Sequence, residues 1–103
     1  MVARVRVIVV NYNAGADLER CAAALAEQSF ADFEAVIADN GSTDGALQAL
    51  AGLDARFRVL SLATNLGFAA ANNRGAAGAE TEWLATLNPD AFPEPGWLGA
   101  LLA

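Results

Sequence analysis

Four short apolar segments of strand length alternate with segments of helical periodicity along this chain. The strand-length segments are residues 4–10, 33–38, 57–63 and 83–87. The helical segments are residues 17–28, a short stretch carrying Leu47 and Leu50, residues 68–79, and a last stretch that begins at Pro95. The β-branched first strand and the short connections predict the order βαβαβαβα. We therefore expect an open, mostly parallel α/β sheet with right-handed crossovers and helices on both faces.

Two local patterns refine this expectation. Small residues on the third helix predict a close approach to the sheet, along an inner stripe of Phe68, Ala71, Asn72, Gly75 and Ala76. The polar turn before the short second helix predicts a capping side chain there, either Ser42 or Thr43.

The charge balance excludes several classes of protein. The 103 residues carry 12 acidic and 6 basic side chains, for a formal net charge of −6, and every basic residue is Arg. A chain this acidic lacks the basic face of a general nucleic-acid binder. Without His or Lys it has no Ser-His-Asp triad, His-ligated zinc, Walker-type phosphate loop or Schiff-base lysine. The single Cys21 forms no internal disulfide and is interpreted as a small apolar helix residue.

Length and hydropathy are typical of one small domain without a membrane span. The longest apolar runs are of strand length, far short of the roughly 18 residues that a spanning helix needs. Arg4 and Arg6 lie inside an alternating pattern instead of before an apolar block, so no export signal is recognised. We therefore expect a cytoplasmic protein and interpret the sequon Asn40-Gly41-Ser42 as a chance match.

Polar residues gather where the predicted strands end. The segments that follow the four strands are Asn11-Tyr12-Asn13, Asp39-Asn40-Gly41-Ser42, Asn65-Leu66-Gly67 and Asn88-Pro89-Asp90. The carboxyl ends of parallel strands share one edge of the sheet, and ligands of open α/β folds bind there. The connections at the opposite edge are mostly small, apolar or ordinary surface charge. This asymmetry predicts a ligand crevice at the carboxyl edge.

Two carboxylates in these segments narrow the class of ligand. Asp39 follows a buried strand and could accept hydrogen bonds from a base edge or a ribose hydroxyl. Asp90 follows a strand and a proline, and a carboxylate there could hold a hard divalent cation on a diphosphate. Taken singly, an ordinary turn residue is the simpler interpretation of either aspartate. No G-x-G-x-x-G follows the first strand, so the dinucleotide fingerprint is missing.

Together and in this order, the four segments resemble glycosyltransferase family 2. The matching motifs are residues 9–13, 39–45, 65–75 and 87–91. The resemblance covers essentially the whole chain and is strongest to the rhamnosyltransferase-like branch of bacterial cell-surface polysaccharide enzymes. It implies a GT-A fold, of which residues 1–103 would be the nucleotide-sugar-binding part, truncated at the C-terminus.

The resemblance also implies roles for individual residues. Nucleotide binding would involve Asn11, Tyr12, Asn13, Asp39, Asn65, Gly67 and Asn88, with Asp39 on the base. Asn88-Pro89-Asp90 stands where the family carries its Asp-x-Asp motif, so Asp90 would hold Mg²⁺ or Mn²⁺ on the diphosphate. Two positions depart from the family pattern. Asn88 replaces the first acid of that motif, and Asn72 stands where an arginine often offers a phosphate contact.

The implied reaction is sugar transfer, with inversion at the anomeric carbon. The donor would be a dTDP- or UDP-linked sugar, rhamnose in the matching branch, and the acceptor a saccharide or lipid-linked saccharide. The catalytic residue is unknown: we expect the general base beyond residue 103, and not at Asp44 or Glu94. The isolated chain is therefore expected to bind nucleotide without transferring sugar, in the cytoplasm or peripherally at the inner membrane face.

Two other interpretations stay open. A non-catalytic nucleotide-binding α/β module would explain the crevice and the absent base, but not the coincidence of four motifs. A nucleotidyltransferase would need a glycine-rich, positively charged loop after the first strand, and residues 11–15 carry no positive charge. Under the truncated-domain interpretation, Trp97, Leu98 and Leu101 would be partly uncovered, so either self-association or poor solubility is expected.

Overall fold

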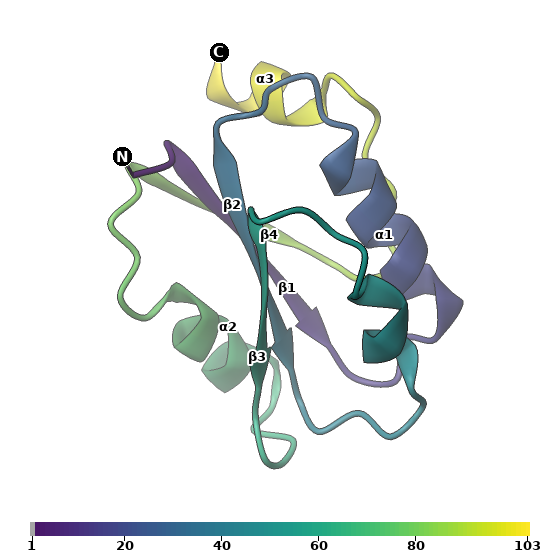
Figure 1. The fold of residues 1–103 in the computed structure, drawn as a ribbon. Coiled ribbons are helices and arrows are strands. Elements are labelled where there is room, and N and C mark those ends of the chain that lie inside the picture. The colour runs from purple at the N-terminus through teal and green to yellow at the C-terminus, as the bar shows by residue number, and fades with distance from the viewer. Residues whose placement is uncertain (1) are drawn as a thin grey trace.

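The computed structural model describes residues 2–103, and within them four strands form one parallel sheet in the order β3-β2-β1-β4 (Figure 1). The strands are β1 (Val5–Asn11), β2 (Phe33–Asp39), β3 (Phe57–Ser61) and β4 (Trp83–Leu87). They alternate with α1 (Ala16–Ala26), the 3-10 helix η1 (Ala46–Leu50), α2 (Phe68–Ala76) and α3 (Trp97–Leu102). The predicted order and the α/β class are confirmed. None of these helices is long and apolar enough to cross a membrane.

Strand β1 lies at the centre of the sheet and is paired on both sides. It runs in register with β2 from Val5 opposite Phe33 to Asn11 opposite Asp39, and with β4 as far as Val9. All seven residues of β1 are buried, which explains its nearly continuous β-branched sequence. From β1 the chain steps outward through β2 to β3, and after α2 it crosses back to place β4 on the other side of β1, so the strand order reverses beside the central strand. Ligands of open parallel sheets bind at such a reversal, beyond the carboxyl ends of the strands.

Alternate residues of the strands face two separate cores. Val7 and Val9 pack in the core formed with α1, η1 and α3, whereas Ile8 packs against α2 on the opposite face. A Cβ atom at Gly75 would lie 2.7 Å from Cγ2 of Ile8, so the glycine permits the close approach of α2. The predicted stripe is wrong at Phe68, which is 60% exposed because it occupies the first position of the helix.

Arg6 ties the end of α2 to the amino edge of the sheet. Its side chain is buried, and its Nη1 donates hydrogen bonds to the carbonyl oxygens of Gly75 at 2.8 Å and Ala77 at 3.2 Å. Its Nε also pairs with the carboxylate of Glu34 at the start of β2. A buried guanidinium with these partners has its charge matched and its donors used, which is a structural role.

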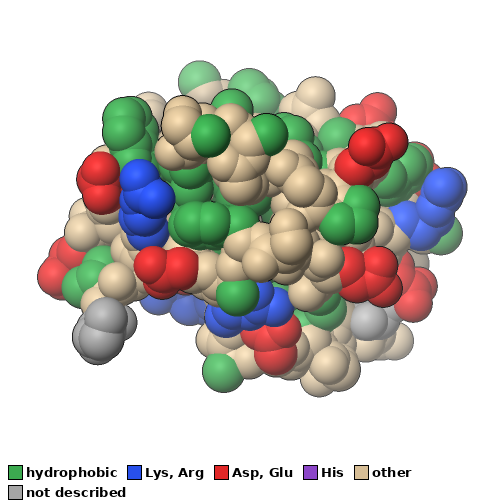
Figure 2. Space-filling view, turned by 90° about the horizontal axis from the view of Figure 1, so that it is seen from above, with side chains coloured by type: hydrophobic (Ala, Val, Ile, Leu, Met, Phe, Trp, Pro, Cys, Tyr) green, Lys and Arg blue, Asp and Glu red, His purple; other side chains and the backbone are tan. Residues whose placement is uncertain are grey.

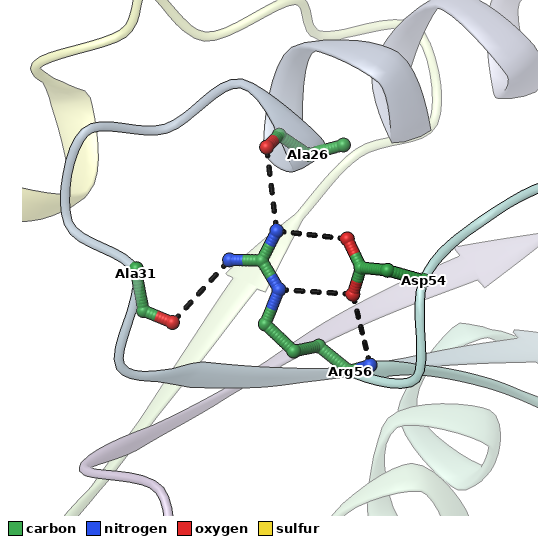
Figure 3. Close-up of polar contacts among 4 residues, drawn as sticks. All are labelled: Ala26, Ala31, Asp54 and Arg56. Carbon is green, nitrogen blue, oxygen red and sulfur yellow. Dashed lines mark hydrogen bonds and ion pairs between the residues drawn. The ribbon is translucent and has the colours of Figure 1, made fainter.

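Arg56 has a similar role beside the start of β3 (Figure 3). Its guanidinium donates two hydrogen bonds of 2.9 Å to the Asp54 carboxylate, and it reaches the carbonyl oxygens of Ala26 and Ala31 at 3.3 Å. Figure 2 views the molecule from the top of Figure 1, where the strands begin, and shows basic and acidic side chains close together among apolar ones. The charges of this edge are thus largely balanced locally.

Strand β4 exposes apolar side chains along the edge of the sheet. Within the described part of the chain it pairs only with β1. Trp83, Leu84 and Leu101 are each more than half exposed and line a cavity of about 500 Å³. The expectation of uncovered apolar surface is met at Leu101 but wrong at Leu98, which α3 turns fully into the core.

Candidate functional site

The segments predicted to bind the ligand all lie at the carboxyl edge of the sheet. Asn11 ends β1 directly opposite Asp39, which ends β2. Residues 65–67 connect β3 to α2, and residues 88–90 follow β4. The ends of β2, β1 and β4 are neighbours in that order, so three of the four segments meet around the end of the central strand (Figure 1).

Asp39 is a buried carboxylate held by neutral donors. Only 3% of the residue is exposed. Nδ2 of Asn11 donates to its Oδ1 at 2.9 Å, and the backbone N–H of Ser42 donates to its Oδ2 at 3.0 Å. None of the ion pairs among residues 2–103 involves Asp39, unlike the paired acids of the amino edge. Its orientation is therefore set by hydrogen bonds, without an ion pair to any described residue.

The Ser42 hydroxyl joins the loops that follow β1 and β2. It accepts hydrogen bonds from Nδ2 of Asn11 at 3.1 Å and from the backbone N–H of Asn13 at 2.9 Å. Oδ1 of Asn13 in turn accepts the Thr43 N–H at 2.8 Å. The prediction that Ser42 or Thr43 caps the second helix is wrong: that helix follows Gly45 and has no side-chain cap. The polar side chains at this turn bind the neighbouring loop instead.

The three predicted residues after β1 differ in accessibility. Asn11 is fully buried, and its Oδ1 has no hydrogen-bond partner among the described residues. Tyr12 is 53% exposed, so its ring is available to a ligand, and Asn13 is exposed with a left-handed φ of 50°. The side chain of Asn11 therefore supports Asp39 from beneath, while Tyr12 and Asn13 form the surface.

The predicted residues Asn65 and Gly67 form the turn into α2. Oδ1 of Asn65 accepts the Gly67 N–H at 2.8 Å, and Gly67 has a left-handed φ of 87°. Among the described residues, no side chain caps α2, whose first turn starts at Phe68. The N–H groups of an uncapped first turn carry partial positive charge and attract anions.

Asn88 and Asp90 lie in an exposed turn that packs over α1. The Ala91 N–H donates to the Asn88 carbonyl at 3.0 Å, and the Cys21 thiol donates to the same oxygen at 3.6 Å. Burial, and secondarily the negative charge of Asp90, raises the pKa of the Cys21 thiol to about 11. Cys21 thus stays a protonated, packed thiol beneath the turn, as its sequence position predicted.

Oxygen ligands for a metal are few at this edge. Residues 2–103 contain no group of three or more His, Cys, Asp or Glu side chains that could hold an ion. The exposed Asp90 carboxylate and the Asn88 amide offer hard oxygen donors. Mg²⁺ and Mn²⁺ accept such sparse protein ligation when phosphate oxygens and water complete their coordination. The donor set therefore fits a cation shared with a phosphorylated ligand.

Basic side chains are concentrated away from the carboxyl edge. Five of the six arginines of the sequence lie near the starts of β1 and β3 or in the last turn of α2. The remaining one, Arg20 on α1, has its guanidinium carbon 4.1 Å from the Phe92 ring centre and its Nη1 3.9 Å from Oδ1 of Asp17. An anion bound at this edge would therefore contact helix N–H groups, together with a divalent cation if one is present, and not arginine side chains.

The two acids considered as a general base have local or peripheral positions. The Asp44 carboxylate accepts the backbone N–H groups of Gly15 at 2.8 Å and Ala46 at 3.0 Å, so it holds the loop together. Glu94 is exposed between β4 and α3. The expectation that neither acid is the general base stays a prediction.

Sequence reasoning missed the roles of Ser42 and Asn40. Asn40 is 3% exposed and contacts the loop before α2, so the asparagine of the glycosylation sequon is buried. The signal for both residues was present, because they directly follow a buried strand within the densest polar segment of the chain.

Solved structures with the same architecture are glycosyltransferases. S. aureus TarS 1–349 in complex with UDP-GlcNAc superimposes with a TM-score of 0.87 at 28% identity, over 96% of this chain and 30% of that one. Mannosyltransferase PcManGT from Pyrobaculum calidifontis, in complex with GDP-Man and Mn²⁺, superimposes with a TM-score of 0.87 at 26% identity. The match covers 99% of this chain and 32% of the mannosyltransferase. The parallel sheet and its polar carboxyl edge thus define an α/β domain of the GT-A glycosyltransferase class.

Sequence comparison identifies the family. The model described as Glycosyl transferase family 2 matches residues 6–103. The N-acetylglucosaminyl-diphospho-decaprenol L-rhamnosyltransferase of Mycobacterium tuberculosis is 36% identical over 107 residues, covering 93% of this chain and 35% of that protein. Validoxylamine A glucosyltransferase of Streptomyces hygroscopicus is 34% identical over 102 residues, covering 94% and 24%. The chain belongs to glycosyltransferase family 2 and spans about a third or less of these relatives.

Proposed function

We propose that this chain forms the nucleotide-sugar-binding part of an inverting glycosyltransferase of cell-surface polysaccharide synthesis. The donor would be a dTDP- or UDP-linked sugar, with rhamnose the first candidate, and the acceptor a saccharide or lipid-linked saccharide. The rhamnosyltransferase relative supports rhamnose and a lipid-linked acceptor, and the TarS complex supports a uridine nucleotide.

The buried Asp39 carboxylate carries this proposal. It is oriented by Asn11 and Ser42 and has no cationic partner in the described chain. An ionised carboxylate has about four acceptor positions, and two of them are used here. The N–H of a pyrimidine base is a fitting donor for the remainder. The exposed ring of Tyr12, directly after β1, offers an apolar surface to the same base.

The diphosphate would lie toward α2. Its negative charge favours the uncapped first turn of that helix, which begins at Phe68 after the left-handed Gly67. Asn65 holds the turn and would lie near the ribose together with Asn88. No arginine needs to reach the phosphates in this arrangement.

A divalent cation would be held by Asp90, with Asn88 close by. The Mn²⁺ complex of the mannosyltransferase neighbour supports a cation in this family, and the oxygen donors of the turn fit either Mg²⁺ or Mn²⁺. When bound, the ion supplies neutralisation of charge on the leaving diphosphate. Asp90 contributes a single carboxylate, so the cation and the nucleotide are expected to bind together.

The general base and the acceptor-binding residues would lie outside residues 1–103. Asp44 is engaged with two backbone N–H groups, and no other acid of the described chain is assigned to this role. We therefore expect the 103-residue chain to bind nucleotide without measurable sugar transfer. Steady turnover by this polypeptide, absent in Asp90→Ala, would overturn that part of the proposal.

The test is a thermal-shift panel with dTDP, UDP and GDP, each with and without Mn²⁺. A ligand at about 100 times its Kd stabilises the folded state by about 2.7 kcal/mol. We expect the largest rise in Tm with dTDP or UDP plus Mn²⁺, and its loss in Asp39→Asn and Asp90→Asn. Asp32→Asn, which changes an exposed acid just before β2, is the matched control. An equal response to all three nucleotides, indifferent to Mn²⁺, would refute the base and metal assignments.

A further inference from the structure

We propose that Asn40 is a positioning residue that sets the start of α2 relative to Asp39. The inference rests on the proposed function, because it concerns how the base-binding and diphosphate-binding ends of the site are held at a fixed separation. Asn40 itself would not touch the nucleotide, because both the oxygen and the nitrogen of its side-chain amide bond to the loop before α2.

Strand alternation sends the two neighbouring side chains to opposite faces of the sheet. Asp39 bonds to Asn11 and Ser42 on the face covered by α1, where Ile37 also lies. Asn40 bonds to the loop that begins α2 on the other face, where Ala38 lies. One dipeptide therefore contacts both halves of the proposed site.

The Asn40 amide uses both of its ends on the same loop. Its Oδ1 accepts the Leu66 N–H at 3.1 Å, and its Nδ2 donates to the Gly67 carbonyl at 3.3 Å. That carbonyl also accepts the Ala71 N–H at 3.1 Å, the first hydrogen bond of α2. The side chain of Asn40 is thus linked directly to the residue from which the helix starts.

The backbone of residues 40 and 41 is itself held in place on both sides. The Asn40 N–H donates to the Asn11 carbonyl at 2.8 Å, which holds the residue to β1. At Gly41, an added Cβ atom would lie 3.4 Å from both Cα and the carbonyl carbon of Thr64, so the backbones of the two loops run close together. The loop before α2 is therefore seated on residues 40 and 41 by independent contacts.

A change at Asn40 is expected to alter the affinity for nucleotides more than the preference among bases. Asp39 would keep its own hydrogen bonds if Asn40 were changed, because they run to Asn11 and Ser42. The N–H groups at the start of α2 would lose their fixed distance from Asp39. A nucleoside diphosphate, whose base and phosphates have a limited span, would then satisfy the two ends less well at the same time.

The test compares Asn40→Asp, Asn40→Ser and the control Asn73→Ala, which removes an exposed asparagine from α2. Aspartate keeps the acceptor for Leu66 and places an oxygen against the Gly67 carbonyl; serine is too short to hold both groups. Hydrogen exchange of residues 64–71 is measured without ligand. The Kd values for UDP, dTDP and GDP are measured by calorimetry with Mn²⁺.

We expect faster exchange in this segment and about tenfold or greater weakening for UDP and dTDP in both Asn40 variants, with the order of preference among the bases retained. Asn73→Ala should match the wild type. Unchanged Kd values in the variants, with a wild-type chain that binds nucleotide, would overturn the inference and leave the proposed function standing. A wild-type chain that binds none of the three nucleotides would overturn both. An altered base preference would show that Asn40 acts on the base site itself, and would also overturn it.

Discussion

The two edges of the sheet differ in whether their charged side chains have partners within the protein. At the amino edge, Arg6 and Arg56 are each paired with an acid and also bond to backbone carbonyls of neighbouring segments. At the carboxyl edge, Asp39 is buried without a cationic partner among residues 2–103, and Asp90 is exposed in a turn. The amino edge has its charges satisfied internally, whereas the carboxyl edge retains acceptors that a ligand can use.

This difference separates stability from binding. Side chains whose partners lie within the protein contribute to the free energy of unfolding, while acceptors left partly free contribute to ligand affinity. We therefore expect substitutions at the amino edge to change stability with little effect on nucleotide affinity. Asp90→Asn should do the reverse. Asp39→Asn should also lower nucleotide affinity, but it should cost some stability as well, because the NH₂ of the new amide would face one of the two donors that the carboxylate now accepts. Four further experiments test the structural half of this contrast.

The largest effect is expected for Arg6→Ala. The change leaves the Gly75 and Ala77 carbonyls without their donor and Glu34 without its partner. Losing such a buried charged group should lower the free energy of unfolding by about 3 kcal/mol, as measured by urea denaturation. Arg58→Ala, at an exposed position of β3, should stay within about 0.5 kcal/mol of wild type. Equal losses in the two variants would remove the special role of Arg6.

Cys21 tests the packing beneath the carboxyl edge. Its pKa is raised from 9.0 to about 11, so near pH 8 the folded chain should carry about 100-fold less thiolate than the unfolded chain. Labelling by a thiol reagent should slow by at least that factor relative to labelling in urea. Above about pH 9 the unfolded thiol ionises first, so stability should fall as the pH rises toward 11. Rapid labelling of the folded chain would mean that the turn does not cover the thiol.

Gly75→Ala tests the approach of α2 to the sheet. Alanine is favoured over glycine in a helix by about 1 kcal/mol, but its Cβ would lie 2.7 Å from a branched core side chain, Ile8. Overpacking of this kind costs about 1–3 kcal/mol, so we expect a net loss of about 1 kcal/mol in urea denaturation. Gly99→Ala in α3 meets only an ordinary 3.8 Å contact and should be neutral or stabilising. A stabilised Gly75→Ala would show that the two layers can separate easily.

The smallest effect is expected for Asp54→Asn. Hydrogen bonds from Arg56 lower the pKa of Asp54 to about 2, so the ionised form is favoured in the folded state. Its contribution is present above about pH 4 and is lost as the pH falls toward 2. The group is exposed, so solvent and salt reduce the effect. Urea denaturation across this pH range should show a slightly weaker acid dependence in the variant. An unchanged dependence would place Arg56 among the ordinary surface pairs.

The strands and the order of elements could be predicted because their signals are local. The β-branched residues of β1 and the polar turns around each strand give boundaries within a residue or two of those observed for β1, β2 and β4. The predicted third helix is too long, since α2 ends at Ala76 and the chain turns at Gly78 with a φ of 75°. The predicted third strand, residues 57–63, is also too long, since β3 ends at Ser61.

The contacts of the candidate site could be predicted only in part. Topology alone places the four polar segments at the carboxyl edge, and this is where they lie. The sequence does not reveal which polar atoms bind one another, because Ser42 reaches Asn13 across 29 positions of the chain. Alternation along β2 could have predicted that Asp39 and Asn40 face opposite layers, but not which loop each one meets. The ligand roles of these residues stay predictions.

The division of work between Asp39 and Asn40 makes the length of β2 a constraint in its own right. A single inserted or deleted residue within this strand would exchange the inward directions of the two side chains, sending the amide toward α1 and the carboxylate toward α2. Both loops would lose their anchors in one step, even though every amino acid of the motif was still present. The position of this motif relative to the buried strand is therefore as important for building the site as the identity of its residues.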